Sequence, residues 1–365
     1  SEIYGESIFT YRFELFGKYE FDSIENFELN FSYSKHNQNS YYGSDYYKAN
    51  QDIFFSQFTL KRKYKKHDLL YGFSIKNNLY DDNTIATQKI VDGQLINNES
   101  NQFIPGLLFQ DQFNPNEKTS IVGGLRIDHF NEHGFVYAPS FHIKYNPGDW
   151  LAFRLNLGTG FRLVNLFSED HAFVSGQREV KILEELNPER SRSAILNTNY
   201  IYTGLNGSGN LDFDLFYTYF SNKIIPNYDD QRYIVYQNTE GYSFSKGFSG
   251  AWNHTFLNGI AISLNFNHQL VKYSQSQNNK SVLFDVEHSP KWTAGLNLKF
   301  PLNKKWSLNS SSNFVGVMQL PKVFDLDQNG ELNLKSRPEK SRPFSIHNIN
   351  VEGKLNFNSE IYFGI

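Results

Sequence analysis

The chain has 365 residues, no cysteine and a formal net charge of -3, and aromatic side chains make up 17% of it although the mean hydropathy is -0.53. The lack of cysteine excludes disulfides, cysteine metal ligands and a cysteine nucleophile. The slightly negative net charge does not favour nucleic-acid binding. The aromatic content argues against a disordered chain. No apolar run reaches the ~18 residues that a transmembrane helix needs.

A two-residue alternation begins near the start of the chain. Apolar side chains occupy every second position from Phe9 to Leu15, with Thr10, Arg12 and Glu14 between them. Because successive side chains of a strand point to opposite faces, this segment predicts a strand with one apolar and one polar face. The pattern recurs along the chain, for example at 27–34, 151–158, 211–219, 260–267 and 292–300.

The length of these segments indicates membrane-spanning strands. About sixteen segments of roughly 10–14 residues follow one another, which exceeds the usual strand length of about 5–6 residues and fits tilted membrane strands of about 9–11 residues with extensions. Short turns at 22–23, 65–66, 114–117, 147–149 and 303–304 alternate with long polar segments at 37–47, 81–101, 162–188, 224–231, 274–287 and 319–342.

Short turns at one rim and long loops at the other predict an all-β fold, a transmembrane antiparallel β-barrel. A soluble sandwich or propeller is the alternative, but its strands are shorter, and no repeat of about 40–50 residues is present. Aromatic residues at segment ends, such as Tyr19, Tyr64 and Trp150, fit interfacial girdles. The polar face predicts a wet or plugged interior lined by Arg12, Glu14, Lys18, Glu28, Lys76, Arg126, Asp128, His142, Lys144, Arg154, Asp212, Asp214 and Lys299.

Residues 158–191 carry the most informative motifs. They read Gly-Thr-Gly-Phe-Arg-Leu-Val-Asn-Leu-Phe-Ser-Glu-Asp at 158–170 and Leu-Asn-Pro-Glu-Arg-Ser at 186–191. This order resembles the barrel of TonB-dependent outer-membrane receptors, and Asp-His-Ala at 170–172 resembles receptors of Bacteroidetes-type bacteria. Many members have Pro where this chain has Val164. The matching family-motif positions, for which a structural role is expected, are Gly158, Gly160, Phe161, Arg162, Asn165, Pro188 and Glu189.

The resemblance implies more than this sequence contains. Such receptors have an N-terminal plug domain, which engages TonB, and a barrel of about 22 strands. We therefore expect residues 1–365 to form a partial barrel domain, with the plug domain and the terminal strands absent from the sequence. The expected location is the outer membrane of a Gram-negative bacterium. The expected partners are outer-membrane lipid and lipopolysaccharide, the TonB complex through a plug domain and a surface lipoprotein, with no nucleic acid and no cofactor.

The function implied by the resemblance is active import of a scarce large solute. A ferric siderophore is the first candidate, followed by haem or cobalamin, with energy supplied through TonB. The alternatives are a passive porin or channel and a receptor-type barrel that acts as a scaffold in a larger assembly. A membrane protease or lipase is a weaker possibility, because the sequence contains neither a Gly-x-Ser-x-Gly elbow nor His-Glu-x-x-His. We expect no enzymatic activity.

Several loop residues are candidate ligand or metal contacts. Tyr41, Tyr42, Tyr46 and Tyr47 form an aromatic cluster that is a candidate contact for a large ligand, although rim packing of the loop is the simpler explanation. His171 beside Glu169 is the best histidine candidate. Asp325, Asp327 and Asn329 match the first half of a calcium loop, but Ser336 replaces the bidentate glutamate of that motif, so an ordinary turn competes with this interpretation. Arg162 and Glu189, which flank the longest loop, are expected to close it.

Overall fold

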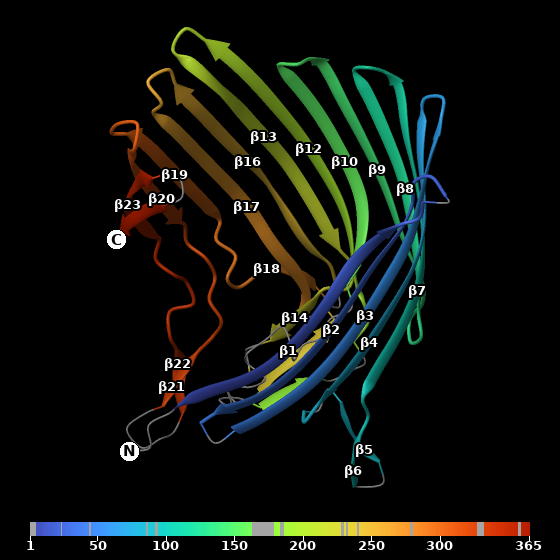
Figure 1. Cartoon of the computed structure of the whole chain (residues 1–365). Coiled ribbons are helices and arrows are strands. Elements are labelled where there is room, and N and C mark those ends of the chain that lie inside the picture. Colours follow the sequence, from blue (N-terminus) through green and yellow to red (C-terminus); the bar gives the residue numbers. More distant parts are fainter. Residues whose placement is uncertain are drawn as a thin grey trace.

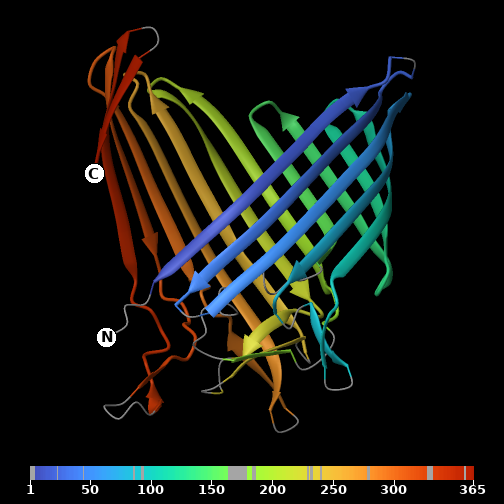
Figure 2. The same cartoon turned by 60° about the horizontal axis from the view of Figure 1, so that its bottom comes forward.

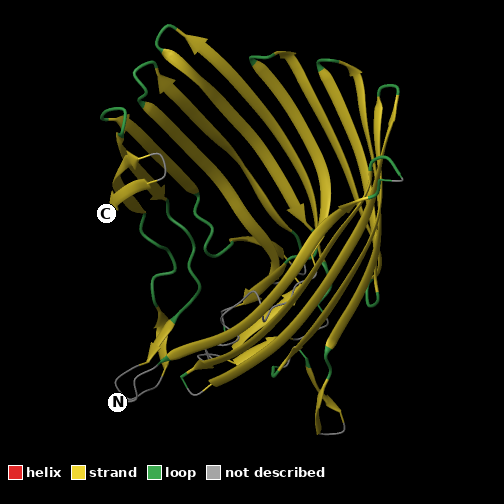
Figure 3. Ribbon diagram, in the orientation of Figure 1, coloured by secondary structure: helices red, strands yellow, loops and turns green. Residues whose placement is uncertain are grey.

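The computed structural model describes residues 5–22, 24–43, 45–84, 87–91, 94–162, 179–182, 186–227, 230, 233–238, 241–277, 280–326, 332–356 and 359–365. Its regular elements are strands joined by turns and loops (Figure 3). None of these described segments forms a helix long and apolar enough to cross a membrane.

Seventeen strands form one antiparallel sheet that curves into the wall of a barrel (Figures 1 and 2). They are β1 (Glu6–Glu20), β2 (Phe27–Tyr42), β3 (Asp45–Tyr64), β4 (His67–Asp82), β7 (Ser100–Asn116), β8 (Thr119–Phe130), β9 (Gly134–Gly148), β10 (Leu151–Arg162), β12 (Glu189–Gly204), β13 (Gly207–Phe220), β16 (Ser243–Phe256), β17 (Ala261–Gln277), β18 (Lys280–Asp285), β19 (Trp292–Pro301), β20 (Trp306–Val315), β23 (Phe344–Asn356) and β24 (Ser359–Gly364).

Each of these strands pairs with the next one along the chain, except that β18 and β19 both pair with β17. The sheet therefore has sixteen strand positions, as the alternation predicts. Within the described residues no pairing joins β1 to β24, so the barrel is not closed.

The two rims of the wall differ as predicted. The short-turn rim carries the connections at 65–66, 117–118, 149–150 and 205–206, whereas the long-loop rim carries those at 83–99, 163–188, 221–242 and 316–343. Three small sheets lie in these long connections: β5 (Gln88–Val91) with β6 (Gln94–Asn97); β11 (Glu179–Ile182) with β15 (Tyr233–Asn238) and β14 (Ile224–Asn227); and β21 (Phe324–Leu326) with β22 (Leu332–Ser336).

Two of the expected long loops are wrong. Residues 37–47 continue β2 and β3 to a tight turn at Gly43, which has φ of +64°. Residues 274–287 mostly belong to β17 and β18. In both places the strands continue toward the long-loop rim, and polar residues occupy both faces of this continuation. The alternation of apolar and polar residues therefore ends before the backbone pairing ends. Polar composition alone cannot distinguish such an extension from a loop.

Strand register sorts the side chains into alternating rows across the wall. One row joins Leu155, Leu196, Leu215, Phe248 and His268 on five neighbouring strands. The row displaced by one residue joins Arg154, Asn197, Asp214, Ser249 and Asn267. Because paired residues share a face and successive residues do not, the first row faces outward and the second lines the lumen.

The lumen row is held together by hydrogen bonds between strands. Arg154 donates from Nη1 to Asn197 Oδ1 at 2.8 Å, Asn197 donates to Asp214 at 2.7 Å, and Ser249 donates to the other oxygen of Asp214 at 3.1 Å. The predicted lumen charges, from Arg12 to Lys299, all fall on this same face by register. The polar half of the alternation therefore forms a connected inner lining.

An aromatic cluster marks the outer surface near the short-turn rim. Trp252 donates from its indole N–H to Tyr202 Oη at 2.7 Å, and His254 Nδ1 lies 2.9 Å from the same oxygen. The rings of Tyr202 and His254 stack at 5.7 Å, and Trp150 meets Tyr200 edge to face. Aromatic rings with polar tips suit the membrane interface, so this cluster fits the predicted girdle.

An arginine at Leu196, near the middle of the apolar row, should destabilise the barrel. Placing a guanidinium at the bilayer midplane costs about 2–4 kcal/mol. Ser193→Arg on the same strand points the charge into the lumen and should cost less than about 1 kcal/mol. Urea unfolding of both variants in lipid vesicles tests this, and equal losses for Leu196→Arg and Ser193→Arg would contradict the assignment of the two faces.

Candidate functional site

The buried residues gather at the long-loop rim rather than along the wall. One cluster contains Tyr42, Tyr47, Ala49 and Tyr80, and a second contains Ile104, Phe130 and Val136. Ile224, Ile225, Ile234 and Tyr236, from the small sheet of β14 and β15, are also buried. Segments of the long connections therefore pack against the inner wall at this end of the barrel. We consider this region the candidate site.

Glu189 connects the two sides of the longest loop. It is 5% exposed and lies opposite Arg162 in the register of β10 and β12. Arg162 donates to Glu189 Oε2 from Nε at 2.9 Å and approaches it from Nη2 at 2.8 Å. Glu189 Oε1 accepts the backbone N–H of Ile224 at 2.9 Å. Both carboxylate oxygens are thus used, one to close the loop and one to hold the start of β14.

Asn238 makes a second connection beside Glu189. Its amide donates to the carbonyl oxygens of Asn187 and Asn222 at 3.0 and 2.9 Å, and its Oδ1 accepts the backbone N–H of Asn187 at 2.8 Å. The two connections at 163–188 and 221–242 are therefore bonded to each other. We call Arg162, Glu189 and Asn238 the loop clamp.

Lys223 lies beside the loop clamp and its amine is poorly solvated. Burial lowers the pKa of Lys223 below its ordinary value; the Glu189 carboxylate opposes this change and the Arg162 guanidinium adds to it. The ammonium also lies 5.2 Å from the ring centre of Phe220. This partly desolvated cation was not among the residues expected from sequence, because its environment is supplied by segments that are distant along the chain.

The predicted tyrosine cluster divides between the two faces of the β2–β3 hairpin. Tyr42 and Tyr47 point to the inner face and are buried, at 6% and 7% exposure. Tyr41 and Tyr46 occupy the opposite face near the hairpin tip, are 47% and 44% exposed, and pack ring on ring at 5.0 Å. The four residues therefore do not form one surface. Strand alternation separates neighbours that a loop could have brought together.

Asp82 secures the connection that follows β4. Tyr47 and Tyr80 share a hydrogen bond at 3.0 Å, and Tyr80 donates to Asp82 Oδ2 at 2.7 Å. The other oxygen, Oδ1, accepts the backbone N–H of Thr84 and the hydroxyl of Thr87, both at 2.9 Å. A buried carboxylate thus links the inner tyrosines to the loop. Sequence reasoning missed Asp82 because nothing local separates it from the neighbouring Asp81.

The remaining predicted site residues are only partly described. Phe161 packs against the cluster of Ile104, Phe130 and Val136 and meets Phe130 edge to face at 5.4 Å. Gly158 and Gly160 lie in β10, and Pro188 is buried just before β12. Asp325 lies in β21, where the structure describes the backbone only. Outside the described residues are Asn165, Glu169, His171, Asp327 and Asn329.

Elsewhere on the inner wall, the half-exposed Arg126 forms an ion pair with the buried Asp128. Asp128 is 2% exposed and accepts hydrogen bonds from Arg126 Nε and Nη2 at 2.7 and 2.8 Å. Gly106, on the facing strand, leaves room for the Asp128 carboxylate, which a Cβ atom there would strike. Across the described part of the chain, no three His, Asp or Glu side chains gather as they would around a metal ion.

Glu189→Gln should loosen the loop clamp. The substitution removes the charge that pairs with Arg162 and should lower the free energy of unfolding by about 1–3 kcal/mol. The control is Glu360→Gln, which breaks a pair with Lys354 whose side chains are 60% and 68% exposed and should change stability by about 0–1 kcal/mol. Urea unfolding in detergent micelles measures both, and a Glu189→Gln loss no larger than that of Glu360→Gln would exclude this role.

Lys223 predicts a pH dependence of stability. Burial lowers the pKa of Lys223 in the folded chain below its ordinary value of 10.5. In the pH window just below 10.5, this lysine is therefore protonated more fully in the unfolded chain than in the folded chain. Stability should therefore fall as pH decreases through this window. Lys223→Met should remove this component, and thermal unfolding at a series of pH values checks it. Identical slopes for the variant and the unaltered chain would show that Lys223 is not responsible.

Comparison with known proteins places this geometry in a family. Residues 5–365 match the family model described as TonB dependent receptor-like, beta-barrel. No curated protein sequence matches the chain. Similar solved structures include the ferric enterobactin receptor of Pseudomonas aeruginosa, with a TM-score of 0.75, 16% identity and coverage of 98% of this chain and 56% of that one.

Two further structures agree. The siderophore receptor PirA of Acinetobacter baumannii has a TM-score of 0.72 and 15% identity, covering 98% of this chain and 58% of that one. The FrpB iron transporter of Neisseria meningitidis has a TM-score of 0.64 and 15% identity, covering 94% and 56%. The chain thus spans less than two thirds of their lengths. These proteins are receptors and transporters, not enzymes, as expected. On the match over residues 5–365, the chain belongs to the family of TonB-dependent receptor β-barrels.

Proposed function

We propose that this chain is the barrel of an outer-membrane receptor that binds and imports a scarce large solute. A ferric siderophore is the first candidate, because the solved structures that resemble the chain include ferric enterobactin and siderophore receptors; haem and cobalamin come next. The observation that carries the proposal is the contrast between the rims. Segments of the long connections lie at one end of a polar lumen, where buried tyrosines and the loop clamp hold them in place.

One accessible part of this rim is the tip of the β2–β3 hairpin. Tyr41 and Tyr46 keep nearly half of their surface exposed, and Tyr46 donates to Asn39 at 2.8 Å, which fixes its ring. Rigid aromatic surface with a polar edge suits a large chelate that carries aromatic groups. We assign Tyr41 and Tyr46 to first contact with the solute and Tyr42 and Tyr47 to support of the inner wall. Glu169 and His171 remain proposed contacts in the longest loop.

The proposal includes partners. Energy would come from the TonB complex through a plug domain within the barrel, and the polar lumen lining gives such a plug hydrogen-bonding partners. Outer-membrane lipid and lipopolysaccharide would surround the apolar outer rows of a protein located in the outer membrane of a Gram-negative bacterium. A surface lipoprotein could cover the long-loop rim as a further partner.

Replacing both hairpin-tip tyrosines should weaken solute capture. Tyr41→Ala with Tyr46→Ala should raise the half-saturation concentration for uptake about tenfold, equivalent to about 1.4 kcal/mol of binding free energy. Tyr64→Ala is the control, because Tyr64 is 61% exposed at the short-turn rim. The measurement is uptake of radioactive iron by iron-limited cells supplied with ferric catecholate or hydroxamate chelates, with haem and cobalamin tested in parallel.

The energy source is tested in the same assay. Collapse of the proton-motive force should stop uptake within minutes if the barrel is energised through TonB. Uptake that continues unchanged would instead establish a passive channel. A deletion strain that grows normally on every one of these solutes would remove the import function altogether.

A further inference from the structure

A cluster of cations and aromatic rings lies on the outward face of the wall near the long-loop rim. Register places Arg192, Tyr219, Phe244 and Lys272 in one row across β12, β13, β16 and β17. Tyr217 and Lys246 follow in the next outward row. Arg192 and Lys246 are exposed, and the Lys246 ammonium lies 5.5 Å from the ring centre of Phe244. We call these six residues the basic outer patch.

The patch lies at the level of one membrane surface. Tyr202, in the aromatic cluster near the short-turn rim, follows Arg192 by ten positions along β12. Ten residues of strand span about 33 Å, or about 25 Å along the membrane normal at a tilt of about 40°, which equals the height of the apolar band of a membrane barrel. If the Tyr202 cluster marks one interface, Arg192 and Lys272 lie at the opposite one, where lipid headgroups begin.

The positive charge of the patch is not neutralised. Among the described residues, neither Arg192 nor Lys246 forms an ion pair. Lys272 contacts Asp285 at 3.1 Å, but Lys291 contacts the same carboxylate at 3.3 Å, so two cations share one anion. The outward face of β2 and β3 differs, because Lys35 there is matched by Asp52 at 3.7 Å. Unpaired cations toward lipid are costly, and an anionic headgroup would supply the missing charge.

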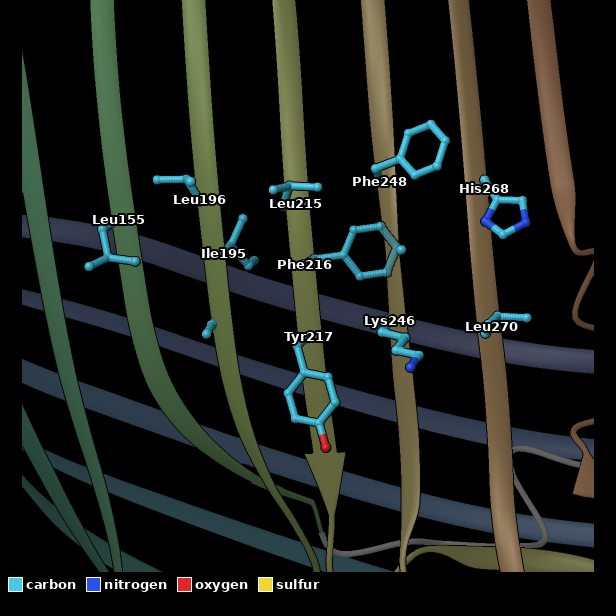
Figure 4. A pocket seen from close by; sticks show the side chains of 12 residues that line it. Leu155, Ile195, Leu196, Leu215, Phe216, Tyr217, Lys246, Phe248, His268 and Leu270 are labelled. Atoms are coloured by element: carbon cyan, nitrogen blue, oxygen red, sulfur yellow. The ribbon is translucent and has the colours of Figure 1, made fainter. Parts of the chain in front are cut away.

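An apolar furrow lies beside the patch, on the side toward the middle of the wall. Leu155, Leu196, Leu215 and Phe248 line it on four strands, and Tyr217 and Lys246 line the edge that adjoins the patch (Figure 4). Side chains of this row lie side by side, so the furrow crosses several strands instead of following one. Cations along one edge and an apolar floor beyond them match a lipid with an anionic head and several acyl chains.

We propose that the basic outer patch binds a phosphorylated glycolipid of the outer leaflet, the lipid A part of lipopolysaccharide. Arg192, Lys246 and Lys272 would contact its phosphate groups, the neighbouring aromatic rings would pack against its sugars, and its acyl chains would lie in the furrow. Arginine and lysine are the usual phosphate ligands of proteins. This assignment rests on the proposed outer-membrane location and adds a specific lipid site to it.

The test uses the full chain in detergent micelles, with native mass spectrometry to count bound lipid. Bis-phosphorylated lipid A should stay bound, and Arg192→Gln with Lys246→Gln should weaken its apparent affinity at least about fivefold, or about 1 kcal/mol. Lys48→Gln is the matched control, because Lys48 is an exposed lysine of β3 outside the patch. Lipid A stripped of both phosphates should bind the unaltered chain as weakly as the double variant binds the intact lipid.

Equal binding of phosphorylated and phosphate-free lipid A, or undiminished binding by the double variant, would overturn the assignment. Circular dichroism of the variant confirms that its barrel is intact, so that a loss of binding is not a loss of fold. The location is tested separately by membrane fractionation. If the chain is found in the outer membrane but binds lipid A with and without phosphates equally, only this lipid site is refuted. A chain absent from the outer membrane refutes the proposed function instead.

Discussion

Backbone hydrogen bonds between neighbouring strands hold each residue opposite a fixed partner, and this register decides which face every side chain occupies. A slip of one residue would bring the row of Leu155, Leu196 and Leu215 into the lumen and turn Asp214 toward lipid. In a bilayer the backbone has no other hydrogen-bonding partner, so pairing and sidedness are enforced together. The inner hydrogen-bonded lining, the aromatic cluster near Tyr202 and the outward cations all follow from this one arrangement.

The wall was predictable from sequence because its signal is local. Alternation of apolar and polar residues within about ten positions determines both the strand and its faces, so the lumen charges and the outward rows were assigned correctly. The ends of strands were not predictable in the same way. Residues 37–47 looked like a loop because they are polar, yet they pair as far as the turn at Gly43. The distinction depends on backbone pairing, which composition does not record.

The candidate site shows the same division. The pairing of Arg162 with Glu189 could be expected, because motif positions at the two ends of one loop are brought together by the hairpin that the loop closes. Lys223 and Asn238 could not, because their partners come from segments that are distant along the chain. Asp82 could not, because nothing local distinguishes it from the neighbouring Asp81. Asn238 bonds to Asn187, 51 positions earlier in the chain. Likewise, the four tyrosines at 41–47 formed one group in sequence and two in space, since strand geometry separates alternate residues.

The β2–β3 hairpin is longer than the membrane requires. The 20 residues of β3 span about 66 Å, or about 50 Å along the normal at a tilt of about 40°, which is roughly twice the apolar band. The half of the hairpin nearer Gly43 therefore extends beyond the bilayer. The height of its tip is set by the length of these extensions and not by the membrane-spanning part of the barrel. Adding or removing one residue in each strand near Gly43 would change this height while leaving every pair beneath it in register. The reach of the protein above its membrane can thus vary between relatives without any change in the barrel that supports it.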